Sequence, residues 1–127
     1  MPITFDHGHA FVDTKVTLPD GRFVTLPMHL DSGMTSALAL VADRDSVLAM
    51  PEGGQATKVC FVSGWRDGRS GPAVSVGLGS AMFPNVATSF STKADRPAVQ
   101  QRGAVGSGLL SQRPYAVNYP GKRLVLL

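Results

Sequence analysis

Asp31 is the residue of this chain best placed to carry out chemistry. It ends the mostly apolar segment Met28-His29-Leu30 and is followed directly by Ser32 and Gly33. A carboxylate at a strand end can act as a general base, and a neighbouring glycine lets a substrate backbone approach closely. Asp-Ser-Gly is also a common turn tripeptide, so the motif indicates catalysis only if a second segment supports it.

Later segments give that support, and they follow in a characteristic order. They are Ala104-Val105-Gly106 with Leu109-Leu110, then Val117-Asn118-Tyr119, then Lys122-Arg123-Leu124. Together with Leu30-Asp31-Ser32-Gly33, this set resembles the retropepsin-like aspartic proteases, including their single-domain bacterial relatives, over about residues 9–127. Two positions depart from the family pattern. Met34 stands where a small residue is usual, and Ala104 is smaller than the usual Ile or Leu.

The resemblance implies a fold and a catalytic arrangement. It implies an all-β, closed barrel with a flap hairpin and one short C-terminal helix, in which Asp31 is the catalytic residue. Ser32 and Gly33 would support the active-site loop, and Val105 would lie near the substrate. The segment Gly64–Gly68 occupies the position of the flap tip, so Gly64 and Trp65 are candidate substrate contacts; Trp65 packed on its own hairpin is the alternative.

The chemistry of this family requires two carboxylates. One takes a proton from water while its protonated partner polarises the peptide carbonyl, and the pair titrates as a unit. Asp31 is the one suitable aspartate here, so a symmetric homodimer would supply the second. The sequence therefore predicts an aspartic endopeptidase acting on peptide or protein substrates. Two alternatives stay open: a catalytically silent peptide-binding or dimerisation module on the same fold, and a small-ligand β-barrel.

Strand patterns agree with an all-β fold. Residues 9–18 and 22–30 predict a hairpin around Pro19-Asp20-Gly21. We also expect one or two helical turns within 41–50 and a second long hairpin that pairs 55–63 with 72–78 through a tip at 64–68. Further expectations are a strand at 82–90, a surface loop at 91–102 and a last hairpin at 115–119 and 122–127.

Composition supports one domain, residues 1–127, with 43% apolar residues to form a core and 14 Gly and 9 Pro for turns. The net charge of +3 comes from dispersed basic residues, which argues against nucleic-acid binding. We expect no cofactor and no metal: His7 and His9 lack further ligands at suitable spacing, and Cys60 in an apolar run predicts a core residue.

Other chemistry is less well supported. A triad of His29 and Ser32 with an aspartate lacks the sharp strand-to-helix elbow, and Gly103-x-x-Gly106-x-Gly108 lacks the ending of a phosphate loop. We find neither a signal peptide nor a transmembrane segment, so we expect membrane contact only through a segment absent from this chain. The sequence assigns no compartment; it is compatible with a soluble domain of a membrane-anchored or exported protein.

Overall fold

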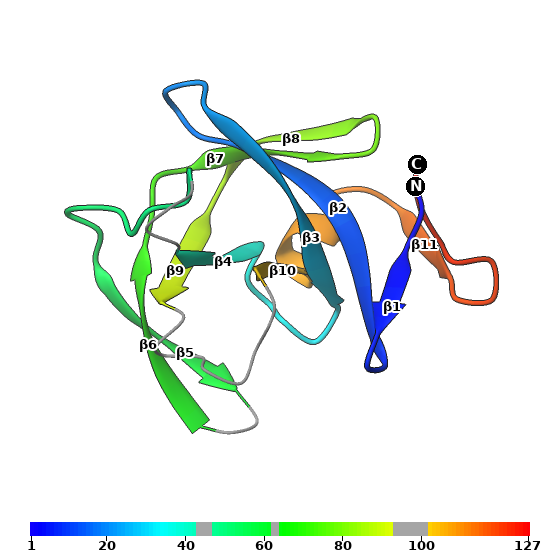
Figure 1. Cartoon of the computed structure of the whole chain (residues 1–127), viewed down its shortest axis with the longest axis horizontal. Helices are drawn as coiled ribbons and strands as arrows, with labels where there is room; N and C mark the ends of the chain where they lie inside the picture. Colours follow the sequence, from blue (N-terminus) through cyan, green and yellow to red (C-terminus); the bar gives the residue numbers. More distant parts are fainter. Residues whose placement is uncertain (43–46, 62–63, 93–101) are drawn as a thin grey trace.

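The computed structural model describes residues 1–42, 47–61, 64–92 and 102–127, with the backbone alone at 59–61 and 64–66. These residues form a mostly β structure with one short helix, α1 (Figure 1). The elements are β1 (Thr4–Asp6), β2 (His9–Thr17), β3 (Phe23–Asp31), β4 (Leu38–Ala42), β5 (Ala56–Phe61), β6 (Gly64–Ser70), β7 (Val74–Leu78), β8 (Ala81–Val86), β9 (Thr88–Thr92), β10 (Gly103–Gly106), α1 (Ser107–Leu110), β11 (Tyr115–Asn118) and β12 (Arg123–Leu126).

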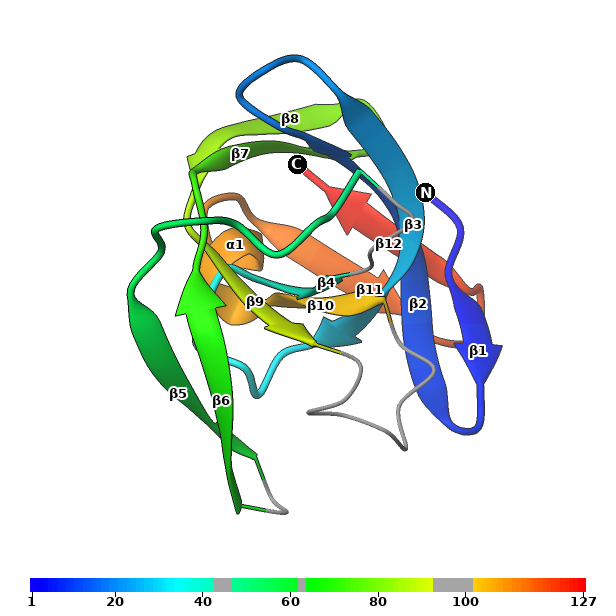
Figure 2. The same ribbon diagram turned by 60° about the vertical axis from the view of Figure 1, so that its left-hand side comes forward.

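Most of the strands form one curved sheet. Its hydrogen-bonded order is β5-β6-β9-β4-β10-β3-β2-β7-β8, with β1 paired to β2. Within the described ranges no pairing joins β5 to β8, so the sheet is open and does not form the closed barrel expected from the sequence. The β5–β6 hairpin pairs with β9 only at Arg69↔Phe90 and Ser70↔Ser89 and projects from the body (Figure 2). Strands that leave the body in this way cannot close the sheet.

The predicted hairpin at 9–30 is confirmed as β2 and β3. Its turn has Gly21 at a φ of +88°, a conformation that glycine adopts without steric cost, and Leu18 N donates to Arg22 O at 2.8 Å. Side chains of β2 alternate between buried and more exposed, and its buried members Val12 and Val16 lie in the core. This alternation is the period-2 pattern of a strand with one face on the core.

The predicted second hairpin is wrong in its partner. β5 pairs with β6, so the segment 64–68 expected at the tip lies within a strand; the connection, 62–63, lies outside the described residues. The segment predicted to return, 72–78, contains β7, which pairs instead with β2 and β8. Burial explains the difference, because Val74, Val76 and Leu78 of β7 are core residues. An apolar strand gains more from pairing within the body than on a projecting arm.

Two further predictions are wrong, and a third concerns residues that are mostly not described. Residues 47–50 are not helical, and 43–46 lie outside the described residues. The single strand expected at 82–90 is two strands, because β8 pairs with β7 whereas β9 pairs with β4 and β6. Of the loop expected at 91–102, Ser91 and Thr92 belong to β9, and 93–101 are not described.

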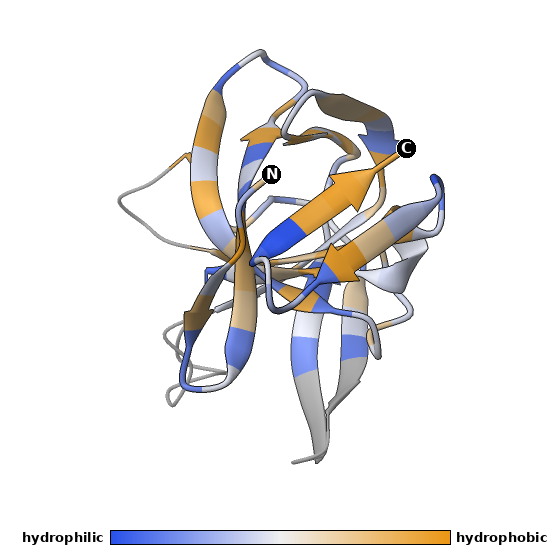
Figure 3. Cartoon of the chain, turned by 90° about the vertical axis from the view of Figure 1, so that its right-hand side faces the viewer, coloured by the Kyte–Doolittle hydropathy of each residue, from blue (hydrophilic) through white to orange (hydrophobic). Residues whose placement is uncertain are grey.

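The predicted C-terminal hairpin is confirmed as β11 and β12, which form a separate two-stranded sheet. The start of the chain lies against it: Ile3 N donates to Lys122 O at 2.9 Å and the Met1 amino group to Leu124 O at 2.7 Å. Figure 3 shows hydrophobic residues along β11 and β12 on this face of the molecule. The two chain ends and the C-terminal hairpin thus form one continuous surface.

Candidate active site

Asp31 lies at the end of β3, where three strands meet. β10 runs parallel to β3 with Gly106 as the partner of Asp31, and it pairs with β4 on its other side. The chain between β3 and β4 therefore forms a loop, residues 32–37, whose two ends both adjoin β10. The order of the sequence motifs predicted that the Asp31 loop and the Gly103–Gly106 segment lie side by side, and this is confirmed.

The carboxylate of Asp31 is oriented by its own loop. Oδ1 accepts hydrogen bonds from Gly33 N at 3.0 Å and Met34 N at 3.2 Å. Met34 N also lies 3.1 Å from Asp31 O, which closes a turn. Asp31 is half-buried. The two backbone donors fix the direction of the carboxylate, as is required of a group that accepts a proton from a bound molecule.

The residues that follow β10 brace this loop. Ser107 donates to Met34 O twice, from its backbone N and from Oγ, each at 2.8 Å. Gly106 N donates to Ala37 O at 3.0 Å. The loop is thus tied at Met34 and Ala37 to a segment more than 60 residues later in the chain, and the Asp31 backbone pairs with that same segment through Gly106.

Two glycines make the close approach possible. A Cβ on Gly106 would collide with Ser36 O and would lie 2.7 Å from Met34 O. A Cβ on Gly108, in α1, would lie 2.6 Å from Thr35 O. Real Cβ atoms do not make backbone contacts this short, so any side chain at these positions would push the Asp31 loop away. The glycines of the second motif therefore serve packing rather than phosphate binding.

The supporting residues predicted beside Asp31 occupy different environments. Ser32 and Gly33 are exposed at the loop surface, where they are accessible to a partner molecule. Val105 is fully buried; its Cα partners are Leu30 of β3 and Leu38 of β4. Val105 thus supports the site from the core. Its contact with substrate stays a prediction, as do the supporting roles of Ser32 and Gly33.

His9 and His29 form a pair on the same strands as the site, although the sequence did not assign them to it. His9 Nδ1 lies 3.3 Å from His29 Nε2, and the two rings meet edge to face with centroids 4.9 Å apart. His29 precedes Asp31 by two positions on β3, so both side chains point to the same face. That alternation was visible in the sequence for His29. The approach of His9 depends on the register between β2 and β3, which the sequence leaves open.

The expected flap residues Gly64 and Trp65 lie at the start of β6, opposite Phe61 and Cys60 of β5. Both belong to the projecting hairpin, at the end that is farther from β9. The side chains of this part of the hairpin are not described. A substrate contact by Gly64 or Trp65 therefore stays a prediction, and so does the core position expected for Cys60.

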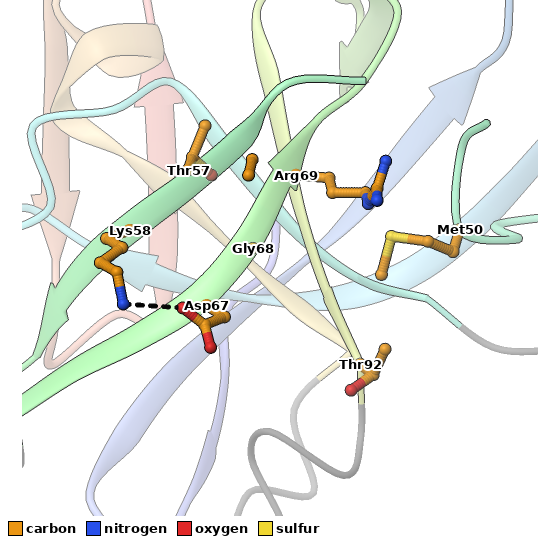
Figure 4. Close-up of a pocket in the computed structure, with 8 residues that line it drawn as sticks. Met50, Thr57, Lys58, Asp67, Gly68, Arg69 and Thr92 are labelled. Atoms are coloured by element: carbon orange, nitrogen blue, oxygen red, sulfur yellow. Dashed lines mark hydrogen bonds and ion pairs between the residues drawn. The ribbon is translucent and has the colours of Figure 1, made fainter. Parts of the chain in front are cut away.

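A separate pocket of about 470 Å³ lies at the base of this hairpin (Figure 4). Exposed Lys58 and Asp67 form an ion pair of 3.0 Å at its edge. Asp31 does not line this pocket, so the pocket is separate from the candidate catalytic carboxylate. The lining residues are Met50, Ala56, Thr57, Lys58, Asp67, Gly68, Arg69 and Thr92.

No group of three or more His, Cys, Asp or Glu side chains in the described part of the chain is arranged to hold a metal ion. No helix in the same residues is long and apolar enough to cross a membrane.

Comparison with known proteins shows a likeness of fold. The structure is similar to that of a retropepsin-like aspartic protease from Rickettsia conorii, with a TM-score of 0.64 and 16% sequence identity. The match covers 98% of this chain and 86% of the other. No protein-family model matches the sequence, and no curated protein matches it. At this identity the likeness concerns the fold.

Proposed function

We propose that this chain is an aspartic endopeptidase whose active form is a homodimer, with one Asp31 from each copy. The observation that carries the proposal is the Asp31 carboxylate itself, which two backbone N–H groups orient at the junction of β3 and β10. The similar fold of the Rickettsia conorii protease supports the same reading. A small-ligand barrel accounts for neither the oriented carboxylate nor the open sheet.

In this mechanism two Asp31 side chains hold one water molecule and share one proton. The ionised carboxylate takes a proton from the water, and the resulting hydroxide attacks the peptide carbonyl carbon. The protonated carboxylic acid donates to the carbonyl oxygen during the attack. The tetrahedral intermediate then collapses, a proton passes to the leaving nitrogen, and the C–N bond breaks. Each copy supplies one carboxylate, so a single chain lacks a complete site.

The exposed surface supports a second copy. Phe5, Tyr119, Val125 and Leu127 are exposed, and Phe5 and Tyr119 contact each other with ring centroids 6.0 Å apart. These residues belong to β1, β12 and the adjoining chain segments, on the side seen in Figure 3. Burial of apolar surface is the main favourable term in association. We assign this surface to contact between copies.

The β5–β6 hairpin is the element suited to cover a bound peptide. It projects from the body and pairs with β9 only at its base, so it can swing without disturbing the core (Figure 2). A cover of this kind excludes water from the reacting groups and holds an extended peptide in place. In this proposal Gly64 and Trp65 contact the substrate from above.

The decisive experiment is cleavage of an unstructured peptide library at several pH values by the wild type, Asp31→Asn and Glu52→Gln. Asp31→Asn keeps the shape of the side chain but cannot act as base, so we expect turnover to fall by at least about a thousandfold. Glu52→Gln makes the same chemical change at an exposed site between β4 and β5 and should leave turnover unchanged. Full activity in Asp31→Asn would place the chemistry elsewhere.

Sedimentation of the same proteins tests the dimer. We expect a dimer at the concentrations that give activity, and a specific activity that rises with concentration below the dimer dissociation constant. A chain that stays monomeric and cleaves peptides would contradict the shared site. A dimer that binds peptides but never cleaves them would identify the silent peptide-binding module.

A further inference from the structure

The His9–His29 pair is the notable cluster of titratable side chains beside Asp31. The nitrogens lie 3.3 Å apart, and the Phe11 ring centroid lies 5.8 Å from that of His29. His9 is exposed and His29 half-buried. The three rings thus form a small surface that is polar at one end and apolar at the other.

The strand geometry places this surface next to the catalytic carboxylate. In β3 the side chains of Leu26 and Met28 are buried, so those of His29 and Asp31 share the opposite face. Residues two apart on a strand are separated by roughly 7 Å. In the β2–β3 register Phe11 is the partner of His29, and the same register continued by two residues brings His9 opposite Asp31. A peptide bond held at Asp31 would therefore place a neighbouring side chain on the two histidines.

We propose that His9 and His29 form a subsite that selects an acidic side chain, Asp or Glu, beside the scissile bond of the substrate. This inference rests on the proposed peptidase function. Two imidazoles whose nitrogens lie 3.3 Å apart bring their ring N–H donors to one place on the surface. A substrate carboxylate placed against both rings would accept hydrogen bonds from them, and these are charge-assisted where a ring is protonated. Phe11 provides an apolar wall for the methylene groups of a glutamate.

Charged side chains on β1, β2 and β3 surround the His9–His29 pair and could compete with a substrate carboxylate. On β1, Asp6 is the Cα partner of His9, and its carboxylate binds His7 Nδ1 at 2.7 Å. On β2, exposed Asp13 lies two positions beyond Phe11, and on β3 Asp31 itself faces the pair. β10 contributes Ala104, which carries no charge, as the partner of His29. Asp6 is therefore engaged by His7, whereas Asp13 and Asp31 are the anions that share the face of the sheet with the pair.

The ordinary pKa values of histidine and glutamate indicate the pH range in which preference for an acidic substrate side chain can be tested. A free histidine is protonated below about pH 6.5 and a glutamate is ionised above about pH 4.3. An ionised glutamate and a charged imidazole coexist most readily between these values, so selection for an acidic side chain is compared at pH 5 and at pH 7.5, where a free histidine is mostly neutral. That range overlaps with the acidic conditions under which two carboxylates share a proton.

The test compares peptides that differ only by Glu or Gln next to the cleaved bond. For the wild type we expect a Glu-to-Gln ratio in kcat/KM of about ten at pH 5 and near one at pH 7.5. His9→Gln and His29→Gln should each lower the ratio at pH 5 to about two or less. His7→Gln is the matched control: His7 precedes the start of β2 by two residues, its side chain is 89% exposed, and a glutamine there can still donate a hydrogen bond to Asp6. It should keep the wild-type ratio.

A wild-type ratio near one at pH 5, or a ratio that both histidine variants retain, overturns the subsite. A protein that cleaves no peptide at all contradicts the peptidase proposal but not the subsite. Binding of fluorescent Glu and Gln peptides to Asp31→Asn at pH 5 then decides the subsite separately. A tighter Kd for the Glu peptide that is lost in Asp31→Asn/His29→Gln supports it, and equal Kd values reject it.

Discussion

The Asp31 loop and the β5–β6 hairpin both extend from one sheet, but the loop is fixed to its neighbours whereas the hairpin is attached only at its base. The Asp31 loop is tied at Met34 and Ala37 to the segment around Gly106, and the glycines there leave no room for adjustment. The hairpin pairs with the body at two residue pairs, Arg69↔Phe90 and Ser70↔Ser89, and its ion pair Lys58–Asp67 is exposed. In the proposed peptidase, a fixed carboxylate and a hairpin free to act as a cover would suit a site that must admit an extended peptide and then exclude water.

Gly106→Ala should give the largest loss of stability. The Gly106 backbone, with φ −100° and ψ 176°, is one that alanine adopts readily, so the effect comes from collision of the new Cβ with Ser36 O and Met34. We expect the free energy of unfolding to fall by about 3 kcal/mol, as for overpacked sites, with loss of activity. Urea denaturation measures the first quantity and peptide cleavage the second.

Gly33→Ala gives the contrasting case within the same site. The atom nearest to a Cβ on Gly33 is Asp31 Oδ1, at 3.3 Å, and Gly33 lies at the exposed surface of the loop. We expect the free energy of unfolding to change by less than about 1 kcal/mol while kcat/KM falls at least about tenfold. Similar stability losses in Gly33→Ala and Gly106→Ala would remove the distinction between a packing glycine and a substrate-facing one.

Ser107→Ala probes the tie between the loop and α1. The change removes the bond from Ser107 Oγ to Met34 O but keeps the one from the backbone N. We expect a loss of about 1 kcal/mol and a fall of roughly 4 °C in Tm. Ser80→Ala, at an exposed position in the β7–β8 turn, is the control and should leave Tm within 1–2 °C. Equal effects would show that the brace contributes nothing.

The sequence predicted the local part of this arrangement well. The β2–β3 hairpin follows from the Pro19-Asp20-Gly21 turn and two alternating segments, all within about 20 neighbouring residues. The proximity of Asp31 to Gly106 followed from motif order, since local periodicity carries no information about parallel pairing with a distant segment. The predicted pairing of 55–63 with 72–78 is wrong because β7, within 72–78, gains more by burial in the body.

The role of His9 shows a different limit. Its contact with His29 depends on the register Thr17↔Phe23, which is set at the turn between β2 and β3. A slip of one residue would move His9 to the other face of the sheet. The sequence gives the turn but not its register, so His29 could be placed beside Asp31 from alternation, whereas His9 could not.

Half-buried Thr57 and buried Thr88 extend the comparison between the hairpin and the body. Thr57 Oγ1 of β5 is buried with no hydrogen-bond partner among the described residues, whereas Thr88 Oγ1 of β9 donates to Pro72 O at 2.9 Å. Thr57→Val should therefore stabilise the protein by about 1 kcal/mol, and Thr88→Val should destabilise it by about 1–2 kcal/mol. Thermal denaturation of both variants gives the two signs, and a loss in Thr57→Val would reveal a bonded hydroxyl.

Asp20→Ala should have the smallest effect, at the end of the β2–β3 hairpin that lies away from Asp31 (Figure 1). The backbone N–H of Arg22 and then its side chain donate to the Asp20 carboxylate and lower the pKa of that group below its usual value of 3.8.

A lowered folded-state pKa of Asp20 adds stability at pH values above the unfolded pKa, and that stability is lost as pH falls through the folded pKa. The difference between wild type and Asp20→Ala should therefore be constant from pH 7 to about pH 5 and shrink below pH 4. Because both side chains of the pair are exposed, 1 M NaCl should weaken the ionic part of the difference, and Asp20→Asn, which keeps an acceptor for Arg22 N, should lose less than Asp20→Ala. Urea denaturation across this pH range measures both variants, and a difference that grows in acid would show that the turn is held by something other than the carboxylate.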